Sequence, residues 1–344
     1  GKCTSHNCTP PPPGIVSWWP GEDNALDALG TNNGVLLNGV TYAAGEKGRG
    51  FWFNTSNGAV QIAGSSVLDG TTAGFTLETW INPTDVAEDR PLFEWNDLNY
   101  WGVHFHIAPG QPFNSNPGPG ELYANIPDSH GNWHQLSSPG GVVVTNIFQH
   151  VALTYDQASG VATIYYNGEV VAQQNIGGFT PRLAGYDLYL GRRMAPAGEA
   201  ASFVGVMDEP AVYNRALTQS EIQAIYQAGS DGKCPVMPEI ISQPTNQTAT
   251  VGQTTSFSVT AAGTAPLSYQ WSLNSTNING ATNTTLTLGN VQLSDAGSYS
   301  VTVSSPYGVA TSSNAVLRVN QPPVADATAT TPLVISTNNS NATV

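Results

Sequence analysis

Short segments in which apolar and polar residues alternate, separated by glycine, asparagine and proline, dominate residues 15–229. A period of two places successive side chains on opposite faces of a β-strand, so each segment predicts a strand with a face to bury. The clearest is 75–83, where Phe75, Leu77 and Ile81 share one face. Sheets bury such faces by stacking on one another, so the pattern predicts an all-β, two-sheet sandwich.

Two local motifs add detail to this prediction. Asn167-Gly168 accepts the positive φ angles of a type I′ turn, so a hairpin is predicted there. Thr218-Gln-Ser-Glu221 forms a capping box, and Leu217 and Ile222 are placed for a hydrophobic staple. One helix is therefore predicted, beginning at Thr218 and ending before Gly229, which suits the C′ position.

The chain of 344 residues is too long for one such sandwich. Its composition changes after a proline-containing linker, beyond which Thr and Ser become frequent. The predicted segments are a leader at 1–14, a first domain at 15–234, the linker at 235–238, a second domain at 239–319, and a further linker with a truncated domain start at 320–344. Because the last segment has no core of its own, we expect this chain to be a fragment of a longer modular protein.

The charge excludes two classes of partner. The formal net charge is -14, and charged residues make up only 10% of the chain. Nucleic acids and anionic membranes both require a basic surface, so neither is expected to bind. No apolar run approaches the ~20 residues of a membrane span, so no membrane insertion is expected. A chain rich in Asn, Thr, Ser and Gly but poor in charge indicates a secreted or cell-surface location.

The three cysteines are Cys3, Cys8 and Cys234. In a secreted protein an odd number means one bridge with a spare thiol, or an intermolecular bridge. A cysteine near each end of the first domain suggests a bridge that closes it. The alternative is that all three are reduced and buried.

The first domain carries blocks of sequence that are specific for a fold. These blocks are 14–30, 32–34, 75–83, 165–168 and 205–217. They resemble the bacterial laminin-G-like, or concanavalin A-like, jelly rolls. The resemblance implies a jelly-roll sandwich in which Cys8 pairs with Cys234, leaving Cys3 spare.

The second domain resembles an I-set-like immunoglobulin fold. Trp271 occupies the place of the core tryptophan, and Asp295-Ala-Gly-Ser-Tyr299 looks like a tyrosine corner. Val259 and Val301 stand where the cysteines that join the two sheets usually lie. The resemblance therefore implies a cysteine-free variant packed around Trp271, which favours a bacterial origin.

A calcium site is the first candidate for function. Acidic and amide residues crowd a glycine-containing loop, and Ca²⁺ prefers such oxygen ligands. The resemblance to jelly rolls implies a structural Ca²⁺ held by side chains of Asp27, Asn33 and Asp208, with backbone oxygens near Asp23 and Gly34. The alternative is an ordinary turn rich in Asp and Asn.

A sugar-binding face is the second candidate. Between 100 and 107 the alternation predicts a core stripe of Trp101, Val103, Phe105 and Ile107, with His104 and His106 on the opposite face. Sugars stack on aromatic rings and are oriented by polar groups. The candidate ligand-binding residues are Trp95, Tyr100, His104, His106, Tyr123 and Trp133. The alternative is that these aromatic residues only fill long loops.

Catalysis is not expected. The sequence has no HExxH or GxSxG motif and no spaced trio of carboxylates on one strand. Glu94 and Asp97 flank a loop aromatic and are predicted to be solvated. His104 and His106 could chelate a transition metal, but they have no recognisable third ligand.

Three functions remain open at this stage. The first is a non-catalytic adhesion module that binds carbohydrate or an extracellular matrix component, with the immunoglobulin-like domain as a spacer. The second is a subunit of an extracellular filament or surface layer, self-assembled by β-strand addition through the tail at 330–344. The third is an accessory part of an enzyme whose catalytic domain lies elsewhere.

Overall fold

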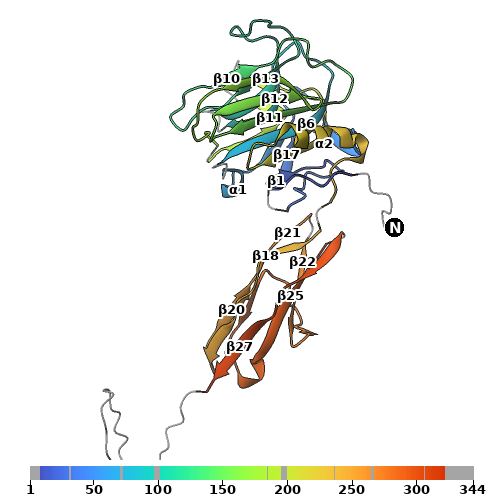
Figure 1. Ribbon diagram of the computed structural model, residues 1–344. Helices are drawn as coiled ribbons and strands as arrows, with labels where there is room; N and C mark the ends of the chain where they lie inside the picture. The colour runs from blue at the N-terminus through green and yellow to red at the C-terminus, as the bar shows by residue number, and fades with distance from the viewer. Residues whose placement is uncertain are drawn as a thin grey trace, which may run out of the picture. The chain divides into compact units, whose positions relative to one another are not determined.

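The computed structural model describes residues 8–30, 32–69, 73–96, 101–183, 185–194, 200–235, 237–264, 267–305 and 307–321. Cys3, Tyr100 and the tail at 330–344 lie outside these residues. The chain forms two compact units (Figure 1). The first is built mainly from residues up to Glu239 and the second mainly from residues after it, and each is described by itself.

Within the described residues, the first unit stacks an eight-stranded sheet on a seven-stranded sheet. The eight-stranded sheet has the order β13-β12-β11-β6-β17-β4-β3, with β1 paired to β17. Its strands are β1 (Ile15–Trp18), β3 (Thr41–Ala44), β4 (Arg49–Phe53), β6 (Gly74–Pro83), β11 (Gln149–Asp156), β12 (Val161–Tyr166), β13 (Glu169–Asn175) and β17 (Gly205–Tyr213).

The seven-stranded sheet has the order β10-β9-β8-β7-β14-β5-β2. Its strands are β2 (Gly34–Leu37), β5 (Ala59–Ile62), β7 (Arg90–Asn96), β8 (Trp101–Ala108), β9 (Glu121–Asn125), β10 (Gln135–Ser137) and β14 (Asp187–Leu190). The short strands β15 (Arg192–Arg193) and β16 (Ala201–Ser202) form a separate pair. The helices of this unit are α1 (Ser66–Asp69), α2 (Gln219–Ala228) and a 3₁₀ turn at Gly229–Asp231.

The main core lies between the two sheets. Phe75, Leu77 and Ile81 of β6 are buried in it, as the alternation predicts. Phe93 of β7 and Phe105 of β8 enter it from the opposite sheet. The all-β fold, with a jelly-roll sandwich and an immunoglobulin-like domain, is confirmed.

Helix α2 covers the outer face of the eight-stranded sheet (Figure 1). Its buried residues Ile222 and Ile225 pack in a second cluster with Leu217 and Trp18. Because this cluster covers the outer face, nearly all of β6 is buried on both sides rather than on one. The helix thus shields a part of the sheet that the alternating pattern alone would leave exposed.

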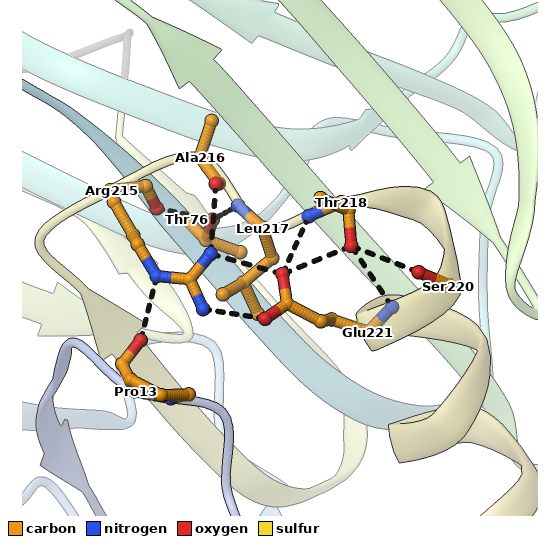
Figure 2. A network of polar contacts seen from close by, with 8 residues as sticks. All are labelled: Pro13, Thr76, Arg215, Ala216, Leu217, Thr218, Ser220 and Glu221. Carbon is orange, nitrogen blue, oxygen red and sulfur yellow. Dashed lines mark hydrogen bonds and ion pairs between the residues drawn. The ribbon is translucent and has the colours of Figure 1, made fainter.

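The predicted capping box of α2 is present (Figure 2). The Thr218 hydroxyl accepts a hydrogen bond from the Glu221 backbone N–H, and the Glu221 carboxylate accepts one from the Thr218 backbone N–H. Arg215 donates to both Glu221 oxygens, at 2.6 and 2.9 Å, and to the Pro13 carbonyl at 2.7 Å. The box therefore also ties the start of β1 to the helix.

Cys8 and Cys234 form the expected disulfide, which joins residues 226 positions apart. Beside it, Lys233 is only 2% exposed and lies within a buried group of charges. Its ammonium nitrogen is 3.0 Å from Glu78 Oε1 and 3.3 Å from Glu209 Oε2. The other Glu78 oxygen lies 3.1 Å from His150 Nε2. The disulfide thus closes the unit directly over an ionic network.

The second unit is a smaller β-sandwich. Its strands are β18 (Glu239–Ser242), β19 (Gln247–Thr250), β20 (Thr255–Ser258), β21 (Thr260–Ala262), β22 (Ser268–Leu273), β23 (Thr276–Asn277), β24 (Thr285–Leu288), β25 (Gly297–Ser305), β26 (Gly308–Thr311) and β27 (Ala315–Asn320), with a 3₁₀ turn at Leu293–Asp295. Trp271 is fully buried in its core with Val259 and Val301. The Tyr299 hydroxyl donates to the Asp295 carbonyl at 2.8 Å, which confirms the tyrosine corner.

Candidate functional site

The candidate site lies on the outer face of the seven-stranded sheet. Phe93 and Phe105 point into the core, so strand alternation turns Glu94 and His104 to the opposite face. These two residues are direct partners across β7 and β8. His106, which is also on β8, is paired with Tyr123 of the next strand, β9. Three adjacent strands therefore bring polar and aromatic side chains together. The shared face of His104 and His106 agrees with the predicted alternation, whereas Tyr123, predicted to lie in a loop, is a strand residue.

Two sequence interpretations are wrong here. Trp95, predicted to bind ligand from a loop, is a strand residue 1% exposed in the main core. Trp101, predicted for the core, is half-buried and lies against Trp133 and His104 instead. The cause is a register shift between the two strands. Glu94 is paired with His104, but Asn96 is paired with Trp101, so two residues along β7 span three along β8. Such a bulge reverses the alternation, and Gly102 at the shift is the residue type that could have signalled it.

A continuous series of aromatic contacts covers the part of this face formed by β8 and β9. Trp133 is 56% exposed, and its ring centroid lies 5.8 Å from that of Trp101. The ring centroid of Tyr123 lies 4.7 Å from that of His106 and 5.9 Å from that of Phe113. The Phe113 side chain is 48% exposed. The exposed rings of Trp133 and Phe113 are thus joined by a buried aromatic layer.

The Glu94–Arg193 ion pair lies in the middle of the face, and sequence reasoning missed it. Arg193 Nε and Nη2 donate to Glu94 Oε1 at 3.0 and 2.7 Å, and the guanidinium lies 5.4 Å over the Trp101 ring. Glu94 is fully buried, whereas the sequence analysis predicted that it would be solvated. Because Glu94 directly follows the core residue Phe93 in a strand, alternation could have placed it on the outer face. Arg193 gives no such signal, because it is 99 positions away in the chain.

Burial shifts the titration of this group. Desolvation raises the pKa of Glu94 to about 7, although the Arg193 charge opposes the rise. Burial lowers the pKa of His104 to about 3, and burial with the Arg193 charge lowers the pKa of His106 well below its ordinary value. Both imidazoles are therefore neutral at pH 7. Burial also raises the pKa of Tyr123 to about 12, so its hydroxyl stays protonated.

Several buried polar atoms of this face have no hydrogen-bond partner among the described residues. They are Glu94 Oε2, both amide atoms of Asn96, His106 Nε2, Glu121 Oε1 and Asn125 Nδ2. Buried polar groups are normally paired, so a concentration of unpaired ones is unusual. Each of these atoms is inaccessible from the surface, so the set lies beneath the exposed rings rather than in direct reach of a ligand.

The residues predicted to hold calcium are engaged in separate contacts. Asp27 is buried, and its carboxylate accepts hydrogen bonds from the backbone N–H groups of Trp18, Leu29 and Asn32, each at 3.0 Å. Asn33 Oδ1 accepts from the Asp27 N–H at 3.0 Å. The carboxylate thus organises the loop, as the alternative of an Asp-rich and Asn-rich turn requires.

Asp23, Gly34 and Asp208, the other predicted calcium ligands, also have contacts of their own. Asp23 is exposed and pairs with Arg49 at 2.6 Å, and the Gly34 N–H bonds to the Ala25 carbonyl. Asp208 is buried, with one oxygen accepting from the Lys47 N–H and the other unpaired among the described residues. Among those residues, no group of three or more His, Cys, Asp or Glu side chains is placed to hold a metal. Calcium binding stays a prediction.

Comparison with known proteins gives two family matches. Residues 54–223 match the concanavalin A-like lectin/glucanases superfamily, and residues 237–305 match the immunoglobulin domain family. No curated protein was found to match the chain. Among the described residues, no helix has both the length and the apolar character needed to cross a membrane.

Three solved structures illustrate the similarity. Domain 4 of AbnA, an extracellular arabinanase from Geobacillus stearothermophilus, in complex with arabinotriose, is 19% identical over 61% of this chain and 96% of its own, with a TM-score of 0.44. The CBM40 of a Ruminococcus gnavus sialidase, bound to sialyllactose, is 20% identical over 45% and 82%, with a TM-score of 0.37. A titin and obscurin-like 1 immunoglobulin complex is 18% identical over 26% and 100%, with a TM-score of 0.25.

Proposed function

We propose that the first unit is a non-catalytic carbohydrate-binding module of an extracellular protein, with the immunoglobulin-like unit as a spacer. The observation that carries this proposal is the pair of exposed rings of Trp133 and Phe113, joined by a layer of aromatic contacts on the outer face of the seven-stranded sheet. A sugar stacks its apolar face on such a ring while its hydroxyls pair with polar groups at the surface. The match to a superfamily of lectins and glucanases supports the same class of ligand.

The residues have distinct proposed roles. Trp133, which is exposed and lies against Trp101, is the stacking platform. Arg193 lies over the Trp101 ring and is fixed by Glu94, so this pair positions the platform from below. The Glu94 oxygen that accepts from Arg193 is committed to that contact, which favours a positioning role over acid–base catalysis. His106 and Tyr123 form the floor of the site.

An extracellular location is part of the proposal. The Cys8–Cys234 disulfide closes the first unit, and such bonds persist in oxidising surroundings. Only 10% of the residues are charged, which suits a secreted protein. The net charge of -14 disfavours binding to nucleic acid. An adhesive role would follow if the glycan belongs to a cell surface or matrix.

A glycan array probed with the full chain tests the proposal. Reproducible binding to related glycans is expected. Each bound glycan is then incubated with the protein and analysed by chromatography, and it should be recovered intact. An array without hits would overturn carbohydrate binding, and release of shorter sugars would overturn the non-catalytic role.

A further inference from the structure

Five asparagine residues of the chain are followed directly by glycine: Asn33, Asn38, Asn57, Asn167 and Asn279. At such a pair the backbone nitrogen of the glycine can attack the side-chain amide carbon of the asparagine, since glycine has no Cβ to hinder the approach. A bond forms between this nitrogen and Cγ, ammonia leaves, and water opens the resulting succinimide to aspartate or iso-aspartate. The pairs are alike in sequence, so the structure decides which of them reacts.

Asn33, Asn38 and Asn167 are held by side-chain hydrogen bonds. The Oδ1 atoms of Asn33 and Asn167 each accept from a backbone N–H, at 3.0 and 2.9 Å. Asn38 Nδ2 donates to the carbonyl of Asn57 at 2.8 Å. The glycine nitrogen after Asn33 is engaged as well, because the Gly34 N–H donates to a backbone carbonyl at 2.7 Å. Each of these amides must lose a hydrogen bond before it can react, which slows the reaction.

Asn57 is exposed, but the glycine that follows it is enclosed. Gly58 is buried, and a Cβ at this position would lie 2.9 Å from the Val40 side chain and 3.0 Å from that of Thr55. The Gly58 N–H donates to the Thr55 carbonyl at 3.5 Å, and the Asn57 carbonyl accepts from Arg192 Nη1 at 2.6 Å. The backbone is thus held on both sides of the bond that would have to turn.

Asn279 and Gly280 lie in an open turn of the second unit, between β23 and β24. Both residues are exposed. Neither the Asn279 side chain nor the Gly280 N–H has a hydrogen-bond partner among the described residues. Gly280 has a φ of +74°, and no atom lies within 4 Å of the position that a Cβ would take there. The Gly280 nitrogen can therefore approach the Asn279 amide without breaking a hydrogen bond of either group.

We propose that Asn279 is a site of spontaneous deamidation that converts ahead of the other four asparagine–glycine pairs. Both products carry a new negative charge, and iso-aspartate also adds one carbon to the main chain. The turn is bonded to the core residue Trp271 on both sides. The Ile278 N–H donates to the Trp271 carbonyl at 2.9 Å, and the Trp271 N–H donates to the Ala281 carbonyl at 3.0 Å. An extra main-chain carbon between these two bonds displaces one of them, so iso-aspartate weakens the second unit.

Peptide mass spectrometry of the full chain, sampled during incubation in mildly alkaline buffer, tests this proposal. Conversion at Asn279 should be at least about tenfold faster than at Asn33, where two hydrogen bonds must break first. In concentrated guanidinium chloride the rates of all the pairs should converge, because the structure that separates them is lost. The proposal is overturned if another pair converts first in the folded chain, or if the same order of rates persists in the denaturant.

The effect on the second unit is tested with two glutamine variants. Asn279→Gln blocks the reaction, because its longer side chain would have to close a larger ring. Asn57→Gln is the matched control, which changes another exposed asparagine before glycine and should leave conversion at Asn279 unchanged. Aged wild type should unfold its second unit at a lower urea concentration than fresh wild type, whereas Asn279→Gln should not change with age. An unchanged midpoint in the aged wild type, or an equal decrease in Asn279→Gln, would contradict the weakening through this turn.

Discussion

The buried charges under the disulfide give a sharp stability prediction for Lys233→Met. The Lys233 ammonium lies within 3.3 Å of both Glu78 and Glu209, and all three side chains are at most 2% exposed. Burial alone would raise the pKa of Glu78, but the charges of Lys233 and His150 and their hydrogen bonds hold it below its ordinary value. Methionine matches the lysine stem in length but removes the charge and the hydrogen bonds to the Glu78 carboxylate and the Glu209 carbonyl.

The expected cost follows from what remains in the interior. Without Lys233, Glu78 and Glu209 stay buried, and the nearest remaining ammonium is Lys47, 3.7 Å from Glu209. Removing one partner of a buried ion pair costs about 3–5 kcal/mol. Lys47 is 26% exposed, so Lys47→Met is the matched control and should cost about 1 kcal/mol or less.

The measurement is urea unfolding at two pH values. In the wild type the lowered pKa of Glu78 gives stability that is present above its unfolded pKa of about 4.3 and is lost as pH falls. In Lys233→Met the effect of burial on Glu78 is no longer opposed by the lysine charge. The pKa of Glu78 in the folded state therefore rises, and its carboxylate takes up a proton as the pH falls. The cost should therefore be largest near pH 8 and smaller near pH 5, and Glu78→Gln should recover part of it. Equal, pH-independent costs for Lys233→Met and Lys47→Met would refute the reasoning.

Three further predictions concern the disulfide, the predicted ion and the second unit. Cys8→Ser should lower the unfolding free energy of the first unit by about 5 kcal/mol in urea, because it opens a loop of 226 positions; a loss below about 1 kcal/mol would contradict this. Burial and the Glu209 charge raise the pKa of Asp208 to about 8, so wild-type stability should fall from about pH 4 to about pH 8 while Asp208→Asn shows less of this fall. If Asp208 also binds calcium, the ion should raise the melting temperature of the wild type and not of the variant, and no shift in either would contradict the calcium prediction. Tyr299→Phe removes the bond to the Asp295 carbonyl and should cost about 1–2 kcal/mol in the second unit, with an unchanged unfolding midpoint as the contrary result.

Local patterns were enough to predict the strands, the helix and a two-sheet sandwich, whereas the jelly-roll and immunoglobulin-like assignments came from resemblance to known families. Asn167 and Gly168 both have positive φ, as the type I′ turn requires, and the Thr218 capping box begins α2 as expected. These signals depend on residues within a few positions of one another. The pairing of Cys8 with Cys234 was implied by resemblance, and the disulfide agrees with it.

The candidate site was only partly predictable, because its parts meet through long-range packing. His104 and His106 could be assigned to the outer face from alternation, but the bulge moved Trp101 to that face as well. Arg193 reaches Glu94 from a short strand far along the chain. A charged residue whose burial depends on such a partner has no local signature in the sequence.

The most direct test of the carbohydrate proposal is a calorimetric titration of Trp133→Ala with the glycan selected on the array. Trp133 is 56% exposed, so its loss should spare the fold while removing the stacking platform. We expect affinity to fall at least about tenfold, since burying a large apolar side chain contributes ~1.5–3 kcal/mol. Tyr307→Ala, which removes an aromatic residue that is 48% exposed and lies outside the candidate site, is the control and should bind as the wild type does. Unchanged affinity in Trp133→Ala would contradict the assignment of this face as the binding site.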